Sequence, residues 1–441
     1  MLLSKGQTGG VSLGMTEDEK VFKDPVHGYI YVHDPVVWDL INTREMQRLR
    51  RIRQLGTTYF AYPGGDHSRF SHSLGVYEVI RQMIQAFDRN NYEWPHAFDR
   101  LAMVSGLLHD VGHAPFSHAL EKTMGTRHEN WSVAIIRDAT TEVHQVLESV
   151  EPGFAEQVAE VIQKTFSNRL IVSMVSGQLD ADRLDYLMRD SIATGVDYGT
   201  FDLARIIRVM RPLNDRLVVR QSGLHTVEAY LLARYFMYWQ VYFHPVSRAG
   251  EVLLRIILER VKELVDSGRA PFMTHPALEP FLRGTVTLDQ YLSLDDSALY
   301  NAFSVWREGS DAILRDLCGR FLDRRLFKEM PWPAGQNGRL ERVRTVVEAA
   351  GYDPNYYCIV DETGTVYYDY YLGSQREPNQ ENAIWLYDQA NARLTEMSSL
   401  SLPIQAIAEE HRPVRRLYVP AEVLGNERFG KLMDDRTDGG A

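Results

Sequence analysis

The chain has 441 residues, of which 44% are hydrophobic and 24% charged, and its formal net charge is −11 at pH 7. The length predicts two or three structural units, and the composition is ordinary for a soluble globular protein. The net negative charge argues against extensive binding to the nucleic-acid backbone. No apolar run is long enough for a membrane span. Two cysteines without a metal-binding or disulfide pattern, and no apolar leader of signal-peptide type, predict a cytoplasmic protein.

The N-terminal segment changes character at Lys20. Residues 1–19 are rich in Gly, Ser and Thr, and we expect a flexible leader in which Met15 suits a native start, residues 1–14 being an upstream extension. Residues 20–32 predict an extended segment, a Pro/Gly turn and a strand. Residues 36–55 predict a helix rich in arginine. Its arginines form either a solvated face or contacts to phosphate oxygens.

A Gly/Pro loop then leads into a helix that carries Arg69 and His72 on one face and runs to about residue 95. Apolar residues at three- and four-residue spacings over 101–111 predict a further helix, with a buried face. That helix carries His109 and Asp110, and position 113 would share the face of position 109. Gly112 and Pro115 then break the helix before position 118.

Three histidines and an aspartate within ten residues (His109, Asp110, His113 and His118) are costly to bury without a partner. The ordinary alternative is a hydrogen-bonded core histidine with a capping aspartate. For the whole group we favour a divalent metal.

The middle of the chain predicts helices over 130–176, followed by an acidic, partly buried helix within 176–190, in which one aspartate completes the metal site. A hairpin is predicted over 210–220 and a helix over 224–243, whose aromatic stripe is either core or a base-stacking surface. A further helix runs to about residue 265.

The last third carries no catalytic pattern. Residues 269–281 suggest a linker, helices follow to about 350, and strands are predicted as a hairpin over 358–368 and near 383–387 and 415–419. We therefore expect a mainly α protein with a helical catalytic core over residues 20–268. Residues 269–441 are expected to form a smaller α+β region for packing, assembly or regulation.

Two imidazoles and two carboxylates make a mixed nitrogen and oxygen site that suits one divalent ion, such as Mn, Mg, Fe, Ni or Zn. Such an ion polarises a phosphoryl oxygen and acidifies bound water. Nearby arginines fit an anionic substrate. The residues therefore predict a metal-assisted phosphoester or phosphoanhydride hydrolase.

Longer motifs narrow this prediction. Asp24-Pro-Val-His-Gly28, Gln47-Arg-Leu-Arg50 leading to Gln54-Leu-Gly56, Arg69-Phe-Ser-His-Ser-Leu-Gly-Val76 and Leu108-His-Asp-Val-Gly-His-Ala-Pro-Phe-Ser-His118 resemble the deoxynucleoside triphosphate triphosphohydrolases. This HD-domain family includes the human SAM-and-HD-domain enzyme and bacterial relatives. The resemblance covers about residues 20–250 and implies an HD-domain helical core, without a SAM domain.

The resemblance implies roles at matching positions. The implied metal ligands are His72, His109, Asp110 and Asp182. The implied catalytic residues are His113, Glu121 and His128, with His118 as general acid beside the leaving 5′ oxygen. The implied substrate contacts are Gln54 (sugar 3′-hydroxyl), Arg69, Arg183 and Arg234 (triphosphate), Tyr186, and Tyr242 against the sugar 2′ carbon. At Tyr242 an extra hydroxyl would clash, which excludes ribonucleotides.

The implied reaction is hydrolysis of a dNTP at its α-phosphorus to the deoxynucleoside and tripolyphosphate. The resemblance also implies a homotetramer activated by nucleotide between subunits, possible further Mg with bound nucleotide, no membrane and no stable nucleic-acid binding. The implied regulatory residues are Lys20, Val21, Asn42, Gln47, Arg50, Arg205 and Arg220. In the human relative, aspartate stands at positions 42 and 121 and lysine at 183. Asn42 therefore weakens guanine-only selection, because an amide offers both donors and acceptors.

Two other functional classes also fit these residues. One is a different HD-type hydrolase: a nucleoside monophosphate phosphatase, a phosphodiesterase or a single-strand nuclease. The other is a non-catalytic nucleotide sensor, which the intact set of histidines and aspartates disfavours.

Overall fold

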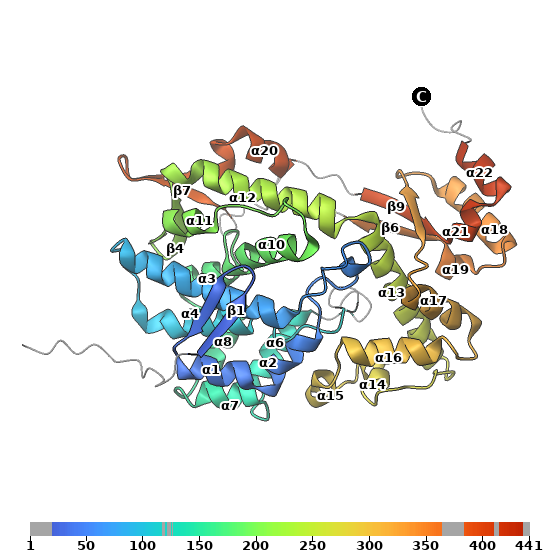
Figure 1. Ribbon diagram of the computed structural model, residues 1–441, viewed down its shortest axis with the longest axis horizontal. Coiled ribbons are helices and arrows are strands. Elements are labelled where there is room, and N and C mark those ends of the chain that lie inside the picture. Colours follow the sequence, from blue (N-terminus) through green and yellow to red (C-terminus); the bar gives the residue numbers. More distant parts are fainter. Residues whose placement is uncertain are drawn as a thin grey trace, which may run out of the picture.

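The computed structural model describes residues 20–116, 120, 125, 127–363, 383–409 and 414–434. It is mainly helical with three small sheets, which confirms the predicted fold class (Figure 1). Within these ranges, no helix combines the length and the apolar character needed to cross a membrane. The leader predicted over residues 1–19 lies outside the described residues.

The N-terminal body begins with the predicted hairpin, β1 (Lys20–Asp24) and β2 (Gly28–Val32), paired antiparallel. The helices that follow are α1 (Pro35–Asn42), α2 (Arg44–Arg48), α3 (Arg69–Arg89), α4 (Asp99–Leu108), α6 (His128–Arg137), α7 (Glu142–Glu148), α8 (Phe154–Ile162), α9 (Arg169–Ser176), α10 (Ala181–Thr194), α11 (Leu203–Val209) and α12 (Leu224–Met237). They share one apolar core, to which α3, α4 and α10 contribute many buried side chains.

The centre of this body is α3, which packs against both α4 and α10. Gly106 lets α4 approach closely, since a Cβ there would lie 2.3 Å from Ile80 Cδ1. At the start of α10, the Asp180 side chain accepts the Arg183 amide hydrogen, and the helix ends at Gly195 with φ of +73°. The side chains near the first turns of α3 and α10 therefore lie close together.

Three predicted helices have different bounds in the structure. The helix predicted over 36–55 breaks at Thr43, which is extended and whose hydroxyl caps α2, and helical structure ends at Arg51. Helix α3 ends at Arg89 rather than near residue 95. Helix α4 ends at Leu108, so the prediction that positions 109 and 113 share a helix face is wrong.

The second body contains α13 (Pro245–Asp266), α14 (Leu278–Arg283), α15 (Leu288–Leu292), α16 (Asp296–Trp306), α17 (Ala312–Leu322), α18 (Asn337–Ala349), α19 (Pro354–Tyr357), α21 (Ala421–Leu424) and α22 (Glu427–Asp434). Its sheet has the order β5 (Lys328–Pro331), β9 (Val414–Val419), β6 (Ile359–Thr363). The second strand of the hairpin predicted over 358–368 lies outside the described residues.

The third sheet connects distant parts of the chain. The predicted hairpin of β3 (Met210–Leu213) and β4 (Arg216–Arg220) turns at Asn214 and Asp215, both with positive φ. Strand β7 (Trp385–Asp388) pairs parallel to β4, and β8 (Arg393–Glu396) completes the sheet. With α20 (Leu402–Glu409), these strands lie beside α12, away from β9 (Figure 1).

Helix α13 packs against the N-terminal segment. Its side chains lie in the second core, which also contains Phe60, and Gly250 lies close to Thr57 and Phe60. Side chains of β7 and α20 belong instead to the first core. The boundary at residue 268 stays a prediction, since helix α13 before it and strand β7 after it each pack across this division.

Candidate metal centre and active site

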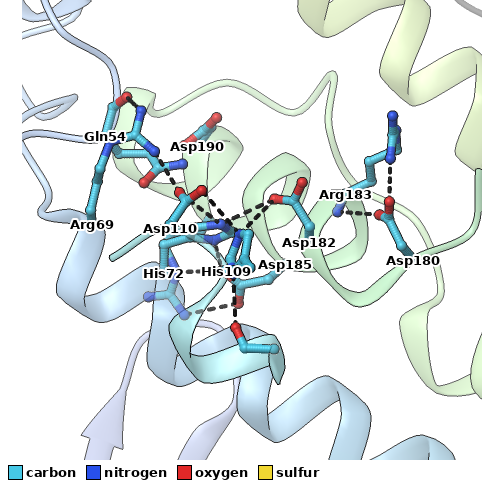
Figure 2. Close-up of polar contacts among 12 residues, drawn as sticks. Gln54, Arg69, His72, His109, Asp110, Asp180, Asp182, Arg183, Asp185 and Asp190 are labelled. Carbon is cyan, nitrogen blue, oxygen red and sulfur yellow. Dashed lines mark hydrogen bonds and ion pairs between the residues drawn. The ribbon is translucent and has the colours of Figure 1, made fainter. Parts of the chain in front are cut away.

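Three side chains from α3, the end of α4 and α10 converge on one point (Figure 2). His72 is fully buried, and its Nε2 lies 3.1 Å from Asp182 Oδ1. His109 Nε2 lies 3.6 Å from the same oxygen. The ligand atoms of an ion bound at about 2.0–2.2 Å lie roughly 3–4.4 Å apart, so these separations fit a shared cation.

Asp185, one turn after Asp182, fixes the ring of His72. His72 Nδ1 donates to Asp185 Oδ2 at 2.8 Å, which leaves Nε2 with its lone pair facing Asp182. A carboxylate oxygen facing a nitrogen lone pair requires a positive charge between them. Without a metal that charge is a second proton: burial lowers the pKa of His72, but Asp182 and Asp185 outweigh burial and raise it to about 10.

Asp185 is itself held on both oxygens. Arg189 Nε donates to Oδ2 at 2.8 Å and Nη2 to Oδ1 at 3.0 Å, while His27 Nε2 lies 2.7 Å from Oδ1. Burial alone would raise the pKa of Asp185, but the charge of Arg189 and the hydrogen bonds of His27 and His72 hold it well below its usual range. Asp24 completes the network by accepting from Arg189 Nη1 at 2.8 Å.

His109 has the geometry of a ligand. Its Nδ1 donates to the Gly106 carbonyl at 2.8 Å, so Nε2 is the free acceptor. This Nε2 is buried and makes no hydrogen bond of normal geometry with any described residue. An orphaned imidazole nitrogen beside two carboxylates fits a divalent cation, so these residues suit the metal that the sequence predicts.

Asp110 lies at the edge of the centre and serves other partners. Its Oδ2 accepts from Arg69 Nη1 at 2.5 Å, and its Oδ1 lies 3.3 Å from His109 Nε2 and 3.2 Å from His113 Nε2. His113 stacks on His128 with ring centroids 3.8 Å apart, so Asp110, His113 and His128 form a second group. The turn after α4 therefore directs His109 and His113 into different groups. The predicted catalytic residues His118 and Glu121 lie outside the described residues.

Two of the predicted phosphate-binding arginines, Arg183 and Arg234, lie close together on the far side of Asp182. Arg183 Nη1 bonds the carboxylate of Asp180 and donates to the Gly177 carbonyl at 2.6 Å (Figure 2). Arg234 Nη1 donates to Gln178 Oε1 at 2.9 Å. The Nε atoms of both arginines are buried and have no hydrogen-bond partner in the described part of the chain.

The remaining predicted substrate residues are Gln54, Tyr186 and Tyr242. The main-chain oxygen of Gln54 accepts from Arg69 Nη2 at 3.4 Å, and its buried Oε1 has no partner among the described residues. Tyr186 lies between His72 and Tyr242, with centroid distances of 6.4 and 6.3 Å. The Tyr242 hydroxyl donates to Asp190 Oδ2 at 2.6 Å.

The predicted regulatory residues belong to two sets of elements. Lys20, Val21, Asn42, Gln47 and Arg50 come from β1, α1, α2 and the turn after it, whereas Arg205 and Arg220 lie on α11 and at the end of β4. Within the first group, Arg50 Nε donates to Gln47 Oε1 at 2.8 Å and Arg50 stacks over Phe70. Arg205 and Arg220 are thus on different elements from the first group.

Comparisons with known proteins agree with this geometry. An HD domain matches residues 69–187 and an HD-associated region matches residues 201–270. The chain is 46% identical over 414 residues to the uncharacterized protein YwfO of Bacillus subtilis, covering 93% of this chain and 94% of that protein. A phosphohydrolase crystal structure from Bacteroides thetaiotaomicron matches with a TM-score of 0.78 at 30% identity, covering 91% of this chain and 99% of that one.

The chain belongs to the HD-domain phosphohydrolase family. A more distant relative is the deoxynucleoside triphosphate triphosphohydrolase SAMHD1 homolog of Dictyostelium discoideum. It is 27% identical over 253 residues, which cover 54% of this chain and 48% of that protein. The match to this named dNTPase therefore covers only about half of each chain.

Sequence reasoning missed the residues that support the HD centre. It quoted the Asp24–Gly28 motif without a role, yet His27 and Asp24 hold the Asp185 and Arg189 pair. A signal was present, because Asp185 and Arg189 follow Asp182 at helical spacings that put them on one face of α10. It also missed Asp190, which accepts from Tyr242 and lies 2.9 Å from His67 Nε2.

Proposed function

We propose that this HD-domain phosphohydrolase hydrolyses deoxynucleoside triphosphates to the deoxynucleoside and tripolyphosphate. The observation that carries the proposal is the pair of largely buried arginines, Arg183 and Arg234, beside Asp182. Their charges repel one another, and Asp180 is the carboxylate that bonds one of them. A chain of phosphates leading away from the His/Asp centre would satisfy both guanidinium groups.

In this proposal, different side chains bind the ion, bind the phosphates and handle protons. A divalent ion held by His72, His109, Asp110 and Asp182 would polarise a phosphoryl oxygen and acidify water. Arg69, Arg183 and Arg234 bind the anionic phosphates and fix their register. His113 is neutral, since burial and the charge of Arg69 keep its pKa well below the usual value, and a neutral ring can orient water or substrate by hydrogen bonding. His128, His118 and Glu121 form the proposed proton-handling group.

The sugar would lie between Gln54 and Tyr242. The unpartnered Gln54 Oε1 suits a hydroxyl donor such as the sugar 3′-hydroxyl. The Tyr242 ring is anchored through its hydroxyl to Asp190, so it resists displacement by a bulkier sugar. This arrangement supports selection of deoxyribose by exclusion of the 2′-hydroxyl.

The test is to incubate the protein with single dNTPs and with mixtures, in Mn or Mg, and to detect tripolyphosphate by phosphorus NMR. His109→Ala should lower turnover at least a hundredfold, because it removes a ligand. His96→Ala is the matched control, since His96 is exposed on the surface and should leave turnover unchanged.

Two other results of this test would indicate a different function. Orthophosphate from monophosphates or cleaved oligonucleotides would indicate a different HD hydrolase. Tight dNTP binding without turnover in any mixture would indicate a sensor.

We also propose that activity depends on nucleotide bound between the subunits of a homotetramer. Its residues would be Lys20, Val21, Asn42, Gln47 and Arg50 from one subunit face and Arg205 and Arg220 from another. Arg50, Arg205 and Arg220 are exposed at the surface, where their guanidinium groups suit the phosphates of a nucleotide held between subunits.

A further inference from the structure

A pocket of about 330 Å³ opens between α9, the strands β4 and β7, and the loop that leads to α10. Its volume is in the range of small-molecule sites, about 300–1,000 Å³. None of the residues proposed to bind metal or substrate lines this pocket. It is therefore separate from the candidate active site, although Gln178 contributes to its wall.

The pocket has an apolar interior. Val172, Leu179 and Ile384 are buried with exposed fractions of 6%, 6% and 3%. Leu217 and the indole of Trp385 complete this surface. A tryptophan together with aliphatic side chains in a pocket wall suits contact with a planar ring.

The rim of the pocket is cationic in a chain whose net charge is −11. Lys164, Arg169 and Arg216 are exposed around it, and Asp215 is the only acid among the described residues of the lining. No ion pair joins Lys164 or Arg216 to a described carboxylate, whereas exposed Arg137 pairs with Glu156 at 2.6 Å. Guanidinium and ammonium groups without carboxylate partners are available to a phosphate.

The lining also provides neutral polar groups between rim and interior. Ser173, Ser176 and the side chain of Gln178 face the same space and supply hydroxyl and amide groups for a sugar-like linker. Gln178 is held from behind, because its main-chain oxygen accepts from the Tyr230 hydroxyl at 2.7 Å and its Oε1 accepts from Arg234. The wall that the pocket shares with the active site is therefore fixed.

We propose that this pocket is a binding site for a small phosphorylated compound that carries a planar ring. The phosphate would contact Lys164 and Arg216 at the rim, and the ring would pack against Trp385. The proposal does not depend on the reaction at the HD centre.

The first test measures binding by calorimetry with the full chain in EDTA, which removes metal-dependent binding at the HD centre. The probes are AMP, CMP and ribose 5-phosphate. Adenosine and inorganic phosphate, the two parts of AMP, are tested separately. We expect AMP or CMP to bind with a Kd of about 1 mM or lower. Adenosine and phosphate should each bind at least tenfold more weakly.

Charge-reversed variants locate the binding. Arg216→Glu and Lys164→Glu should each raise the Kd of the nucleotide at least tenfold. Arg208→Glu is the matched control, because Arg208 is an exposed arginine on α11 outside the pocket, and its Kd should match the parent within about twofold. All these positions are exposed, and circular dichroism checks that each variant is folded.

A third measurement tests whether the ring of the nucleotide lies against Trp385. Nucleotide should quench tryptophan fluorescence in the parent, and Trp385→Phe should lose that quench while calorimetric binding persists. Failure of AMP, CMP and ribose 5-phosphate to bind overturns the proposal. So does binding that Arg216→Glu leaves unchanged, or binding of adenosine or phosphate as tight as that of AMP.

Discussion

At the scale of single residues, the position of Asp185 decides how His72 is presented. Asp185 accepts the Nδ1 hydrogen of His72 and is held by Arg189 and His27. A carboxylate behind a ligating imidazole sets its tautomer and raises its basicity. The ligand set therefore depends on a residue that is not itself a proposed ligand.

We predict that Asp185→Asn weakens metal binding by about 10- to 100-fold, as loss of such a partner typically does. The measurement is competition of Mn with a fluorescent chelator. Asp88→Asn, on the exposed part of α3, is the control and should keep the parent affinity. An unchanged affinity in folded Asp185→Asn would show that His72 needs no orientation from α10.

Tyr242 gives a second residue-scale prediction, which depends on the proposed dNTPase activity. Tyr242→Ala should allow hydrolysis of ATP, because it removes the ring that would block a 2′-hydroxyl. Tyr242→Phe keeps the ring and loses only the hydrogen bond to Asp190, so it should reject ATP more strongly than Tyr242→Ala but less strongly than the parent. The ratio of dATP to ATP turnover measures the effect, and an unchanged ratio in Tyr242→Ala would refute the assignment.

At the scale of elements, the packing of α3 on α10 controls the centre. Gly75 on α3 faces Asp185, and a Cβ there would lie 1.9 Å from Asp185 Oδ1 and 2.5 Å from Arg189 Nη2. The two helices approach this closely because Gly75 has no side chain. The helix contact and the support of His72 are thus one structural feature.

Gly75→Ala should lower the free energy of unfolding by about 1–3 kcal/mol, the usual cost of overpacking a buried site. It should also weaken Mn binding, since Asp185 must move. Gly338→Ala in α18 is the control, because nothing lies within 4 Å of its Cβ, and it should be neutral or slightly stabilising. Chemical denaturation measures the stability of both variants. Equal stabilities of Gly75→Ala and the parent would contradict the close contact.

At the scale of the whole molecule, the proposed activation predicts assembly. A mixture of dNTPs with Mg should raise the mass measured by light scattering toward that of four chains. Arg50→Glu should oppose this rise by placing negative charge where nucleotide phosphates are proposed to bind. Arg89→Glu, an exposed arginine at the end of α3, is the control and should assemble normally. A constant mass at all nucleotide concentrations would contradict the proposal.

Much of the architecture follows from local patterns. Apolar spacing over 101–111 predicts α4, and Asn214-Asp215 predicts the β3–β4 hairpin, because burial of one face and turn geometry involve neighbouring residues. The strands β5 and β8 were missed, since each has only four residues and no alternating pattern. The break at Thr43 was missed because its capping hydroxyl competes locally with an otherwise continuous helical pattern.

The sequence alone determined the fold class, most helices and the chemical kinds of the candidate ligands, because these depend on side-chain type and short-range periodicity. The family resemblance implied that His72 and Asp182, 110 positions apart, share one ion, but only the tertiary structure brings their atoms together and places His109 and His113 in different groups. It also decided that β7 pairs with β4. Such pairings depend on which faces of distant elements can approach closely, and that complementarity leaves no pattern in neighbouring residues.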